Sequence, residues 1–272
     1  MKIMMVGDVV GKAGREAALS LIPGLRTTHR ADFVILNAEN SAGGLGITPD
    51  ISSTLLQRAK VDVITLGNHA WAKKEVYTYL DNELRIIRPA NYPPRVPGRG
   101  HGVFQTEVGP IAVGVVQGRT FMDPSDDPFR AADSIIEDVK GVAKVIFLEF
   151  HGEATSEKQA FGYYVDGRAS AVVGTHTHVQ TADERILPGG TAYISDVGMT
   201  GPVNSVIGMK VEVVLPRFLT HLPIKFEVAD GPAILCGVVI EVDGETGRSG
   251  TISRFQAHTK DINHSQPSDK ED

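Results

Sequence analysis

The chain has 272 residues, of which 42% are apolar and 22% charged, and its formal net charge at neutral pH is -6. This composition is typical of a globular protein with its own core and excludes a disordered or fibrous chain. An acidic chain lacks the general electrostatic attraction of nucleic-acid-binding proteins. The single cysteine, Cys236, excludes an internal disulfide, a cysteine-rich zinc module and an iron-sulfur cluster. Any metal ion would therefore be held by nitrogen and oxygen ligands.

Neither a secretory leader nor a membrane span is expected from the sequence. Residues 1–8 lack the basic and apolar regions of a signal peptide, so we expect mature protein from Met1. No apolar run approaches the roughly 20 residues that cross a bilayer. The expected compartment is the cytoplasm.

Short apolar runs alternate with stretches of helical spacing in the first third of the chain. The expected strands comprise residues 3–6, 33–36 and 61–66, and the expected helices comprise residues 17–30, 50–60 and 74–83. This alternation favours an α/β fold, in which functional side chains lie beyond the carboxyl ends of the strands. Four polar groups follow the three strands: Asp8, Glu39, Asn68 and His69.

The rest of the chain is expected to form a second strand series. Residues 102–118 alternate between apolar and polar side chains, which is typical of a hairpin, and residues 127–140 have helical spacing. Strands are expected at 145–150, 171–174 and 192–195. The runs 211–214, 224–228, 234–242 and 251–255 are expected to be antiparallel strands that close the second sheet. We expect one domain over residues 1–260 and a disordered tail over residues 261–272, because the tail has no periodicity.

Potential metal ligands follow the strands of both series. In chain order they are Asp8, Glu39, Asn40, Asn68, His69, His151, His176 and His178. Carboxylate, amide and imidazole groups suit divalent ions such as Mn, Fe(II) and Zn. A set of this size can hold two ions about 3.5–4 Å apart, an arrangement that binds a phosphoryl group.

Each of these groups also has an ordinary structural interpretation. Two residues apart on a strand, His176 and His178 share a face and can simply be exposed or hydrogen-bonded. Residues 68–69 can form a polar turn, and Asp8 or Glu39 can cap a helix. The coincidence of potential ligands at the end of each strand favours the metal site over these separate interpretations.

The glycine-rich stretches exclude two nucleotide-binding classes. Residues 7–13 are one residue short of a phosphate loop, and Ala13 stands where that loop has the Ser or Thr that binds magnesium. The glycines at 7, 11 and 14 do not match the dinucleotide fingerprint either. Residues 41–46 are expected to form either a flap over the site or a plain surface loop.

In their order and their neighbours these residues resemble the calcineurin-like metallophosphoesterases. The segments that carry the resemblance are Gly7-Asp8, Asn37-Ala38-Glu39-Asn40, Gly67-Asn68-His69, His151 and Gly174-Thr175-His176-Thr177-His178. Residues 37–44, 149–158 and 176–184 are similar to the bacterial YmdB-type branch, and the similarity spans nearly the whole chain. It implies a four-layer sandwich, with two facing mixed β-sheets flanked by α-helices, and a binuclear phosphodiesterase that acts on cyclic nucleotides.

The resemblance also implies a ligand set. One divalent ion would be held by Asp8, Glu39, Asn40 and His178, and the other by Glu39, Asn68, His151 and His176, with Fe, Mn or Zn as candidates. The wider family has Asp-x-His in its first motif and a bridging aspartate, whereas this chain has Asp8-Val9-Val10 and Glu39. Asn40 would take the place of the absent histidine. His69 is then the group that binds no metal.

On this interpretation the expected reaction is hydrolysis of 2′,3′- or 3′,5′-cyclic nucleoside monophosphates. The two ions would polarise the phosphoryl oxygens and activate a bridging water as the nucleophile. His69 would protonate the leaving alkoxide as the general acid. Residues 43–46, Arg119 and Trp71 are candidates for lining the substrate site.

Other functions remain open from the sequence. A phosphomonoesterase would need further cations for its dianionic substrate and a nuclease would need a basic track, and neither is evident. A protein that senses nucleotides without turnover would bind them tightly and form no product. We expect a small phosphodiester as the partner, no membrane, no strong nucleic-acid surface, and, from base rates alone, a homodimer or homotetramer.

Overall fold

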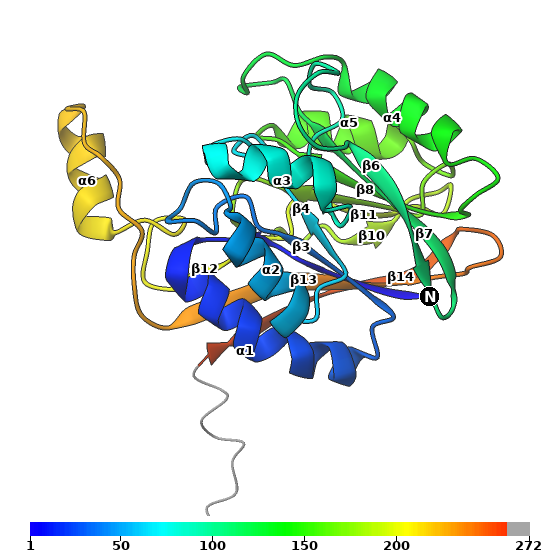
Figure 1. The fold of residues 1–272 in the computed structure, drawn as a ribbon, viewed down its shortest axis with the longest axis horizontal. Helices are drawn as coiled ribbons and strands as arrows, with labels where there is room; N and C mark the ends of the chain where they lie inside the picture. The colour runs from blue at the N-terminus through cyan, green and yellow to red at the C-terminus, as the bar shows by residue number, and fades with distance from the viewer. Residues whose placement is uncertain (260–272) are drawn as a thin grey trace, which may run out of the picture.

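Two mixed β-sheets face each other at the centre of the computed structural model, which describes residues 1–259 (Figure 1). The predicted tail over residues 261–272 lies outside the described residues. The first sheet has eight strands, in the order β2-β12-β13-β1-β3-β4-β5, with β14 beside β13. The second has six, in the order β10-β11-β9-β8-β7-β6.

The strands of the first sheet are β1 (Lys2–Val6), β2 (Asp8–Val9), β3 (Phe33–Asn37), β4 (Val63–Thr65), β5 (Ile86–Ile87), β12 (Met199–Pro202), β13 (Ala233–Val242) and β14 (Ser249–His258). Those of the second are β6 (His101–Thr106), β7 (Gly109–Gln117), β8 (Val145–His151), β9 (Ala171–Thr175), β10 (Arg185–Ile186) and β11 (Ala192–Ile194). The helices are α1 (Gly11–His29), α2 (Pro49–Arg58), the 3-10 helix η1 (Lys74–Val76), α3 (Tyr77–Asn82), α4 (Pro128–Asp138), α5 (Thr155–Tyr164) and α6 (Val211–Thr220).

The continuous apolar runs of the central strands arise because both of their faces are buried. In β1, Ile3 and Met5 pack into the core between the two sheets, whereas Met4 and Val6 pack against the helices outside the first sheet. Strands buried on both faces read as unbroken apolar runs rather than as an alternation. This is why the sequence identifies these strands well.

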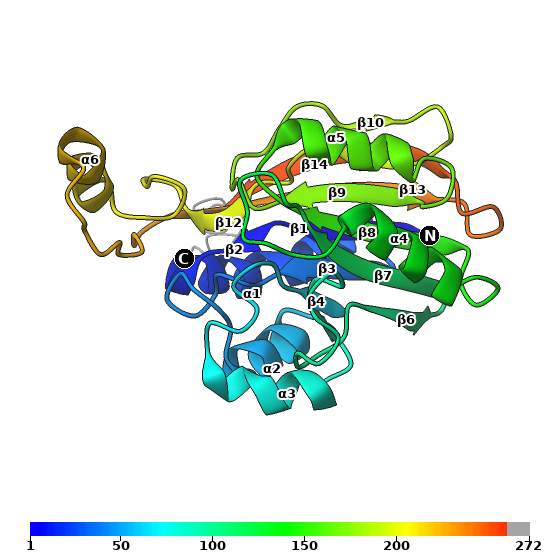
Figure 2. The same ribbon diagram turned by 90° about the horizontal axis from the view of Figure 1, so that it is seen from above.

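Helices cover the outer face of each sheet and complete four layers. Residues of α1 and α2 belong to the core outside the first sheet, and residues of α4 and α5 to the core outside the second. Figure 1 shows α1 below the strands and α4 and α5 above them, and Figure 2 shows α4 and α5 in front of the second sheet from above. The arrangement confirms the predicted α/β fold. None of the helices within residues 1–259 is long and apolar enough to span a membrane.

Several helix boundaries follow from capping chemistry. Thr48 precedes Pro49 at the start of α2, and its hydroxyl accepts a hydrogen bond from the amide of Ile51. Asp127 caps α4 by accepting hydrogen bonds from two backbone amides. Such caps satisfy amides that have no partner within the helix.

Three predictions for the C-terminal third are wrong. Residues 211–214 form the first turn of α6 rather than a strand, and residues 224–228 contribute only an isolated bridge between Val228 and Met209. A short run rich in valine does not distinguish a strand from a helix. The strands at 234–242 and 251–255 exist as β13 and β14, but β13 pairs antiparallel with β1 and so joins the first sheet. Sheet membership depends on such distant pairings, which no local pattern encodes.

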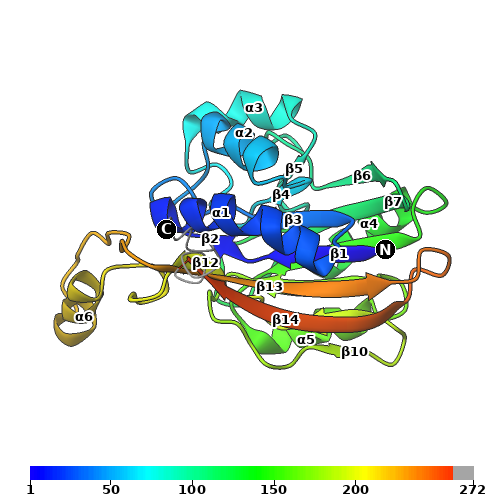
Figure 3. The same cartoon turned by 90° about the horizontal axis from the view of Figure 1, so that it is seen from below.

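The α6 segment stands apart from the four layers. We call residues 203–228, between β12 and β13, the arm; α6 lies within it. In Figures 1 and 3 the arm projects from the end of the molecule opposite the N-terminus. That end is where the parallel strands β1, β3 and β4 terminate.

Candidate functional site

The structure brings all eight candidate residues together at the carboxyl ends of the parallel strands. They come from the segments that follow β1, β3, β4 and β9, and from the last residue of β8. Some of these residues are far apart in the sequence; Asp8 and His176, which are in contact, are 168 positions apart. Contacts of hydrogen-bond length join all eight residues into one network. The residues concerned are Asp8, Glu39, Asn40, Asn68, His69, His151, His176 and His178.

Glu39 lies at the centre of this network. Its Oε1 lies 3.2 Å from Nε2 of His151 and 3.5 Å from Nδ1 of His69, and its Oε2 accepts a hydrogen bond from the amide of His69 at 3.0 Å. Burial raises the pKa of Glu39, but the imidazoles of His151 and His69 outweigh burial and hold that pKa well below its usual range. Glu39 is thus a buried carboxylate that stays ionised.

His151 directs one ring nitrogen at three candidate ligands. Nε2 lies 2.9 Å from Oδ1 of Asn68, 3.2 Å from Glu39 and 3.1 Å from Nδ1 of His176. Burial lowers the pKa of His151, but the Glu39 carboxylate and other acidic groups outweigh burial and raise it to about 9. Burial and the charge of His151 lower the pKa of His176 to about 3. Ligand atoms of Glu39, His151 and His176 all lie within 4.8 Å of one another, so these residues could hold a metal ion.

A close backbone approach explains the glycine that precedes Asn68. A Cβ atom at Gly67 would lie 2.2 Å from Nε2 of His151, which is far inside van der Waals contact. Only glycine therefore lets the loop after β4 pass against the His151 ring. The glycine of the Gly67-Asn68-His69 motif is therefore required for packing.

His151, His176 and His178 each have a contact for the ring nitrogen that does not face the other candidate ligands. Nδ1 of His151 lies 2.9 Å from the hydroxyl of Thr175, which donates to the buried Glu149 at 2.8 Å. Nε2 of His176 lies 3.3 Å from Glu153, and Nδ1 of His178 lies 2.9 Å from the carbonyl of Ile207. Such outer contacts fix the ring orientation and tautomer of histidines that bind metals.

Two buried polar groups complete the candidate ligand set. Asp8 is fully buried, and its Oδ2 accepts a hydrogen bond from the amide of His176 at 3.3 Å, whereas its Oδ1 has no hydrogen-bond partner among residues 1–259. Asn40 Nδ2 lies 3.2 Å from Oε1 of Glu39 and 3.2 Å from Nε2 of His178, and Oδ1 lies 2.8 Å from Nδ1 of His69. Asn40 thus presents its amide nitrogen to the candidate ligands, and a role as an oxygen ligand requires the amide to turn over.

A buried ion pair holds the loop that carries His176 and His178. Nζ of Lys158 lies 2.8 Å from Oδ2 of Asp196 and donates to the carbonyl of Thr175 at 2.7 Å. The same carboxylate accepts a hydrogen bond from the amide of Thr177 at 3.0 Å. The ion pair therefore contacts the backbone on both sides of His176.

A cavity of about 830 Å³ opens over the network. Glu39, Asn40, His69, His176 and His178 line one part of it, and residues 43–45 line another, as predicted for part of the glycine-rich loop. Trp71 and Arg119 do not line it, contrary to our expectation. The Trp71 indole donates to the carbonyl of Pro97, and the Arg119 guanidinium donates to Asp127.

Sequence reasoning missed three contributors to the cavity. Glu153, Lys73 and the arm also line it. Glu153 lies within the segment that carries the family resemblance, so its proximity to His151 in sequence was an available signal. The arm gave none, because residues 211–214 and 224–228 were expected to be strands.

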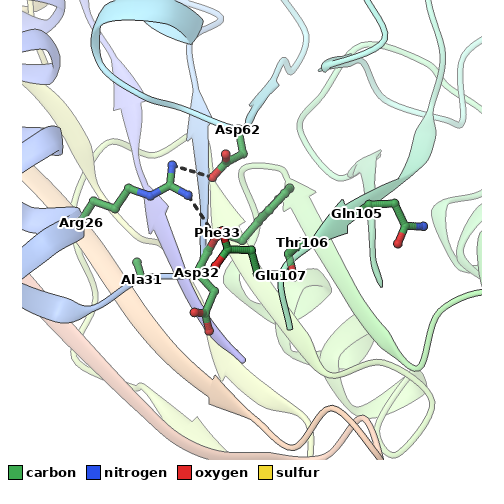
Figure 4. A pocket seen from close by; sticks show the side chains of 8 residues that line it. All are labelled: Arg26, Ala31, Asp32, Phe33, Asp62, Gln105, Thr106 and Glu107. Atoms are coloured by element: carbon green, nitrogen blue, oxygen red, sulfur yellow. Dashed lines mark hydrogen bonds and ion pairs between the residues drawn. The ribbon is translucent and has the colours of Figure 1, made fainter. Parts of the chain in front are cut away.

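A second hollow, of about 610 Å³, lies at the other end of the strands (Figure 4). It is lined by the residues around Phe33 and Asp62, where β3 and β4 begin, and by the turn between β6 and β7. Arg26 forms an ion pair with Asp62 across it, at 3.0 Å. None of the eight candidate residues lines this hollow.

Comparison of the sequence with known proteins gives consistent matches over nearly the whole chain. A family model described as "YmdB-like protein" matches residues 4–255. A 2′,3′-cyclic-nucleotide 2′-phosphodiesterase of Bacillus subtilis (strain 168) is 50% identical over 255 residues, which cover 94% of this chain and 96% of the relative.

Solved structures match at the level of the fold as well. A hypothetical protein from Thermus thermophilus has a TM-score of 0.89 and 44% identity, covering 95% of this chain and 99% of that one. A structure described as a novel phosphatase from Mycoplasma pneumoniae has a TM-score of 0.89 and 35% identity, covering 95% of this chain and 93% of that one. A "Putative 5'-Nucleotidase" from Staphylococcus aureus has a TM-score of 0.58 and 14% identity, covering 94% of this chain and 54% of that one. This likeness concerns the fold alone.

Proposed function

The chain belongs to the YmdB-like family, and on that premise we propose that it is a metal-dependent phosphodiesterase that hydrolyses cyclic nucleotides, with 2′,3′-cyclic nucleoside monophosphates as the main class. The observation that carries this proposal is the convergence of Glu39, His151 and His176 beside a cavity of small-molecule size. The name of the Bacillus subtilis relative supports the choice of substrate.

Two divalent cations are proposed as cofactors, with Fe, Mn and Zn as the candidates that this donor set accepts. Asp8, Glu39, Asn40 and His178 would hold one cation, and Glu39, Asn68, His151 and His176 the other. Two observations support cations at this position. Within the described part of the chain, the buried Oδ1 of Asp8 has no hydrogen-bond partner. Nε2 of His151 faces two oxygen acceptors and another imidazole nitrogen, which a single proton cannot satisfy together.

When bound, such cations polarise phosphoryl oxygens and lower the pKa of water from near 16 towards 7. The chain itself supplies orientation. The outer contacts of His151, His176 and His178 keep one nitrogen of each ring directed into the network. The ionised Glu39 places a negative charge between the two halves of the ligand set, which is what a bridging position requires.

His69 is the proposed general acid. Its side chain is 32% exposed and lines the cavity, so it can reach a substrate, and its Nδ1 lies against Asn40. The ring is therefore held through one nitrogen while Nε2 is available to the leaving oxygen of the substrate. Protonation of a poor leaving group by a positioned side chain contributes about 10²- to 10⁴-fold to the rate.

A panel of phosphate esters tests the proposed reaction. The manganese-loaded protein is offered 2′,3′-cyclic AMP, 3′,5′-cyclic AMP, adenosine 3′-monophosphate and a single-stranded RNA at equal concentrations. We expect turnover of the cyclic diesters and little or none of the monoester or the RNA, since the protein is acidic overall. A protein that released phosphate from the monoester faster than it opened the cyclic diesters would be a phosphomonoesterase instead.

A further inference from the structure

The cavity over the candidate ligands has two chemically different halves. One half is formed by the polar network, and the other by apolar side chains of the arm. The arm residues that line it are Val206, Ile207, Met209, Val214, Phe218 and Phe226, together with Lys225. Small-molecule sites commonly combine an apolar wall with a few polar groups that fix orientation.

The aromatic rings of this wall are open to solvent. Phe218 is 70% exposed and Phe226 is 47% exposed, although both line the cavity. Val214 and Phe218 lie four residues apart on α6, so they share one face of that helix. A flat apolar ligand in the cavity would cover these rings and remove them from water.

The arm is tied directly to the candidate metal ligands. The carbonyl of Ile207 lies 2.9 Å from Nδ1 of His178, and Ile207 itself has φ of 46°, a left-handed conformation that β-branched residues rarely adopt. On the opposite side, a Cβ atom at Gly44 would lie 2.6 Å from Val228 and 3.2 Å from Met209. The base of the arm is therefore packed closely between His178 and the glycine-rich loop, and its wall has a defined position relative to the network.

We propose that the arm forms the nucleobase-binding wall of the cavity, with Phe218 and Phe226 covering the base while the phosphoryl group lies at the polar network. This inference rests on the proposed function, because it assumes that the reacting phosphate lies at the candidate metal ligands. Aromatic side chains bind any base through its flat face, and such stacking has little base preference. The wall thus selects for a nucleoside without selecting among adenine, guanine, cytosine and uracil.

Two cations complete the complement to a nucleotide. Lys73 and Lys225 line the same cavity, on the side of the glycine-rich loop and on the arm respectively. Lys73 is close to Gly46, where an added Cβ would lie 3.0 Å from its side chain. These ammonium groups offset the negative charge of a nucleotide and of Glu153, which lines the same cavity.

The test compares substrates that differ only in the base. Wild-type protein, Phe218→Ala and Phe226→Ala are assayed on 2′,3′-cyclic AMP and on ribose 2,3-cyclic phosphate, which lacks the base. Each substitution is expected to lower kcat/KM on cyclic AMP by about 5- to 150-fold and to leave the base-free substrate unchanged. Phe218→Tyr and Phe226→Tyr, which keep a stacking ring, should retain most of the activity.

A matched control comes from the other face of α6. Leu219 is adjacent to Phe218 and 73% exposed, but it does not line the cavity. Leu219→Ala removes a similar apolar side chain from the same helix and is expected to change neither substrate. An equal loss on both substrates in the phenylalanine variants, or no loss on cyclic AMP, would overturn the proposal.

A binding measurement separates this proposal from the proposed function. Equilibrium dialysis of adenosine 3′-monophosphate and of ribose 3-phosphate needs no turnover, and we expect tighter binding of the nucleotide, lost in Phe226→Ala. Wild-type protein that hydrolyses no cyclic diester contradicts the proposed function, and the dialysis then decides the inference alone. If the phenylalanine variants instead dissociate an oligomer and leave nucleotide binding unchanged, the wall is an interface between copies and the inference fails.

Discussion

Nδ1 of His69 lies 2.8 Å from Oδ1 of Asn40, and the amide nitrogen of the same asparagine lies 3.2 Å from Nε2 of His178. One amide group thus connects the proposed general acid to the proposed metal ligands. If the amide turns so that Oδ1 faces the ligands, Nδ2 donates to Nδ1 of His69. The proton of the neutral ring is then at Nε2. The orientation of the Asn40 amide therefore determines which nitrogen of the neutral His69 ring carries the proton.

Replacing His69 tests its role as the acid. His69→Ala is expected to lower kcat on 2′,3′-cyclic AMP by about 10²- to 10⁴-fold, because the leaving alkoxide loses its proton donor. Metal content, measured by mass spectrometry after desalting, should remain that of the wild type. His101→Ala is the control, since the His101 side chain is 31% exposed, like His69, but does not line the cavity. Loss of metal from His69→Ala would assign this residue to the ligands.

Replacing Glu39 should act on the metal ions rather than on proton transfer. Glu39→Gln keeps the shape of the side chain but removes the buried charge that contacts His151, and we expect loss of both ions and of activity. Glu153→Gln is the comparison, because Glu153 is half exposed and contacts Nε2 of His176, the ring nitrogen that points away from His151. It should retain the ions and lose activity modestly. Two bound ions per chain in Glu39→Gln would contradict the bridging position.

The buried ion pair between Lys158 and Asp196 predicts a stability effect. Lys158→Met leaves an uncompensated buried carboxylate and is expected to lower the free energy of unfolding by about 3–5 kcal/mol, measured with urea. Adding Asp196→Asn should recover part of that loss, because the unpaired charge is gone. The exposed pair of Lys140 and Glu137 supplies the control, since Lys140→Met should cost less than about 1 kcal/mol. Equal losses in the free energy of unfolding for Lys158→Met and Lys140→Met would contradict a larger contribution of the buried pair to stability.

The single cysteine gives a pH-dependent prediction. Burial and the nearby Asp196 carboxylate raise the pKa of the Cys236 thiol to about 12, so the reactive thiolate is scarce in the folded protein at pH 8. Iodoacetamide should label folded protein far more slowly than protein in guanidinium. Because the folded pKa lies above that of a free thiol, Cys236 favours folding below about pH 9 and this contribution is lost as the pH rises towards 12. Rapid labelling of the folded protein at pH 8 would contradict the buried position.

The sequence predicts the central strands and the candidate ligands for the same physical reason. β1, β3 and β8 are buried on both faces and therefore appear as apolar runs, and the polar groups that follow them must meet at one edge of the molecule. The close approach of Gly67 to the His151 ring, at 2.2 Å from a Cβ position, shows why the motif glycines accompany these groups. The apolar runs and the polar groups that follow them are visible in the local sequence.

The sequence does not predict features that depend on distant packing. Residues 211–214 form the first turn of α6, although their valines favour a strand locally. The pairing of β13 with β1, which places it in the first sheet, joins residues more than 230 positions apart. The orientation of the Asn40 amide depends on His69 and His178 together.

The most direct test of the account is the hydrolysis of 2′,3′-cyclic AMP by protein whose metal content is known. Protein stripped with a chelator and reloaded with manganese is assayed by chromatography of the products. We predict two ions per chain, formation of adenosine 3′-monophosphate, loss of activity on stripping and its return on reloading. Intact cyclic AMP after long incubation with protein that carries two ions would contradict the proposed function.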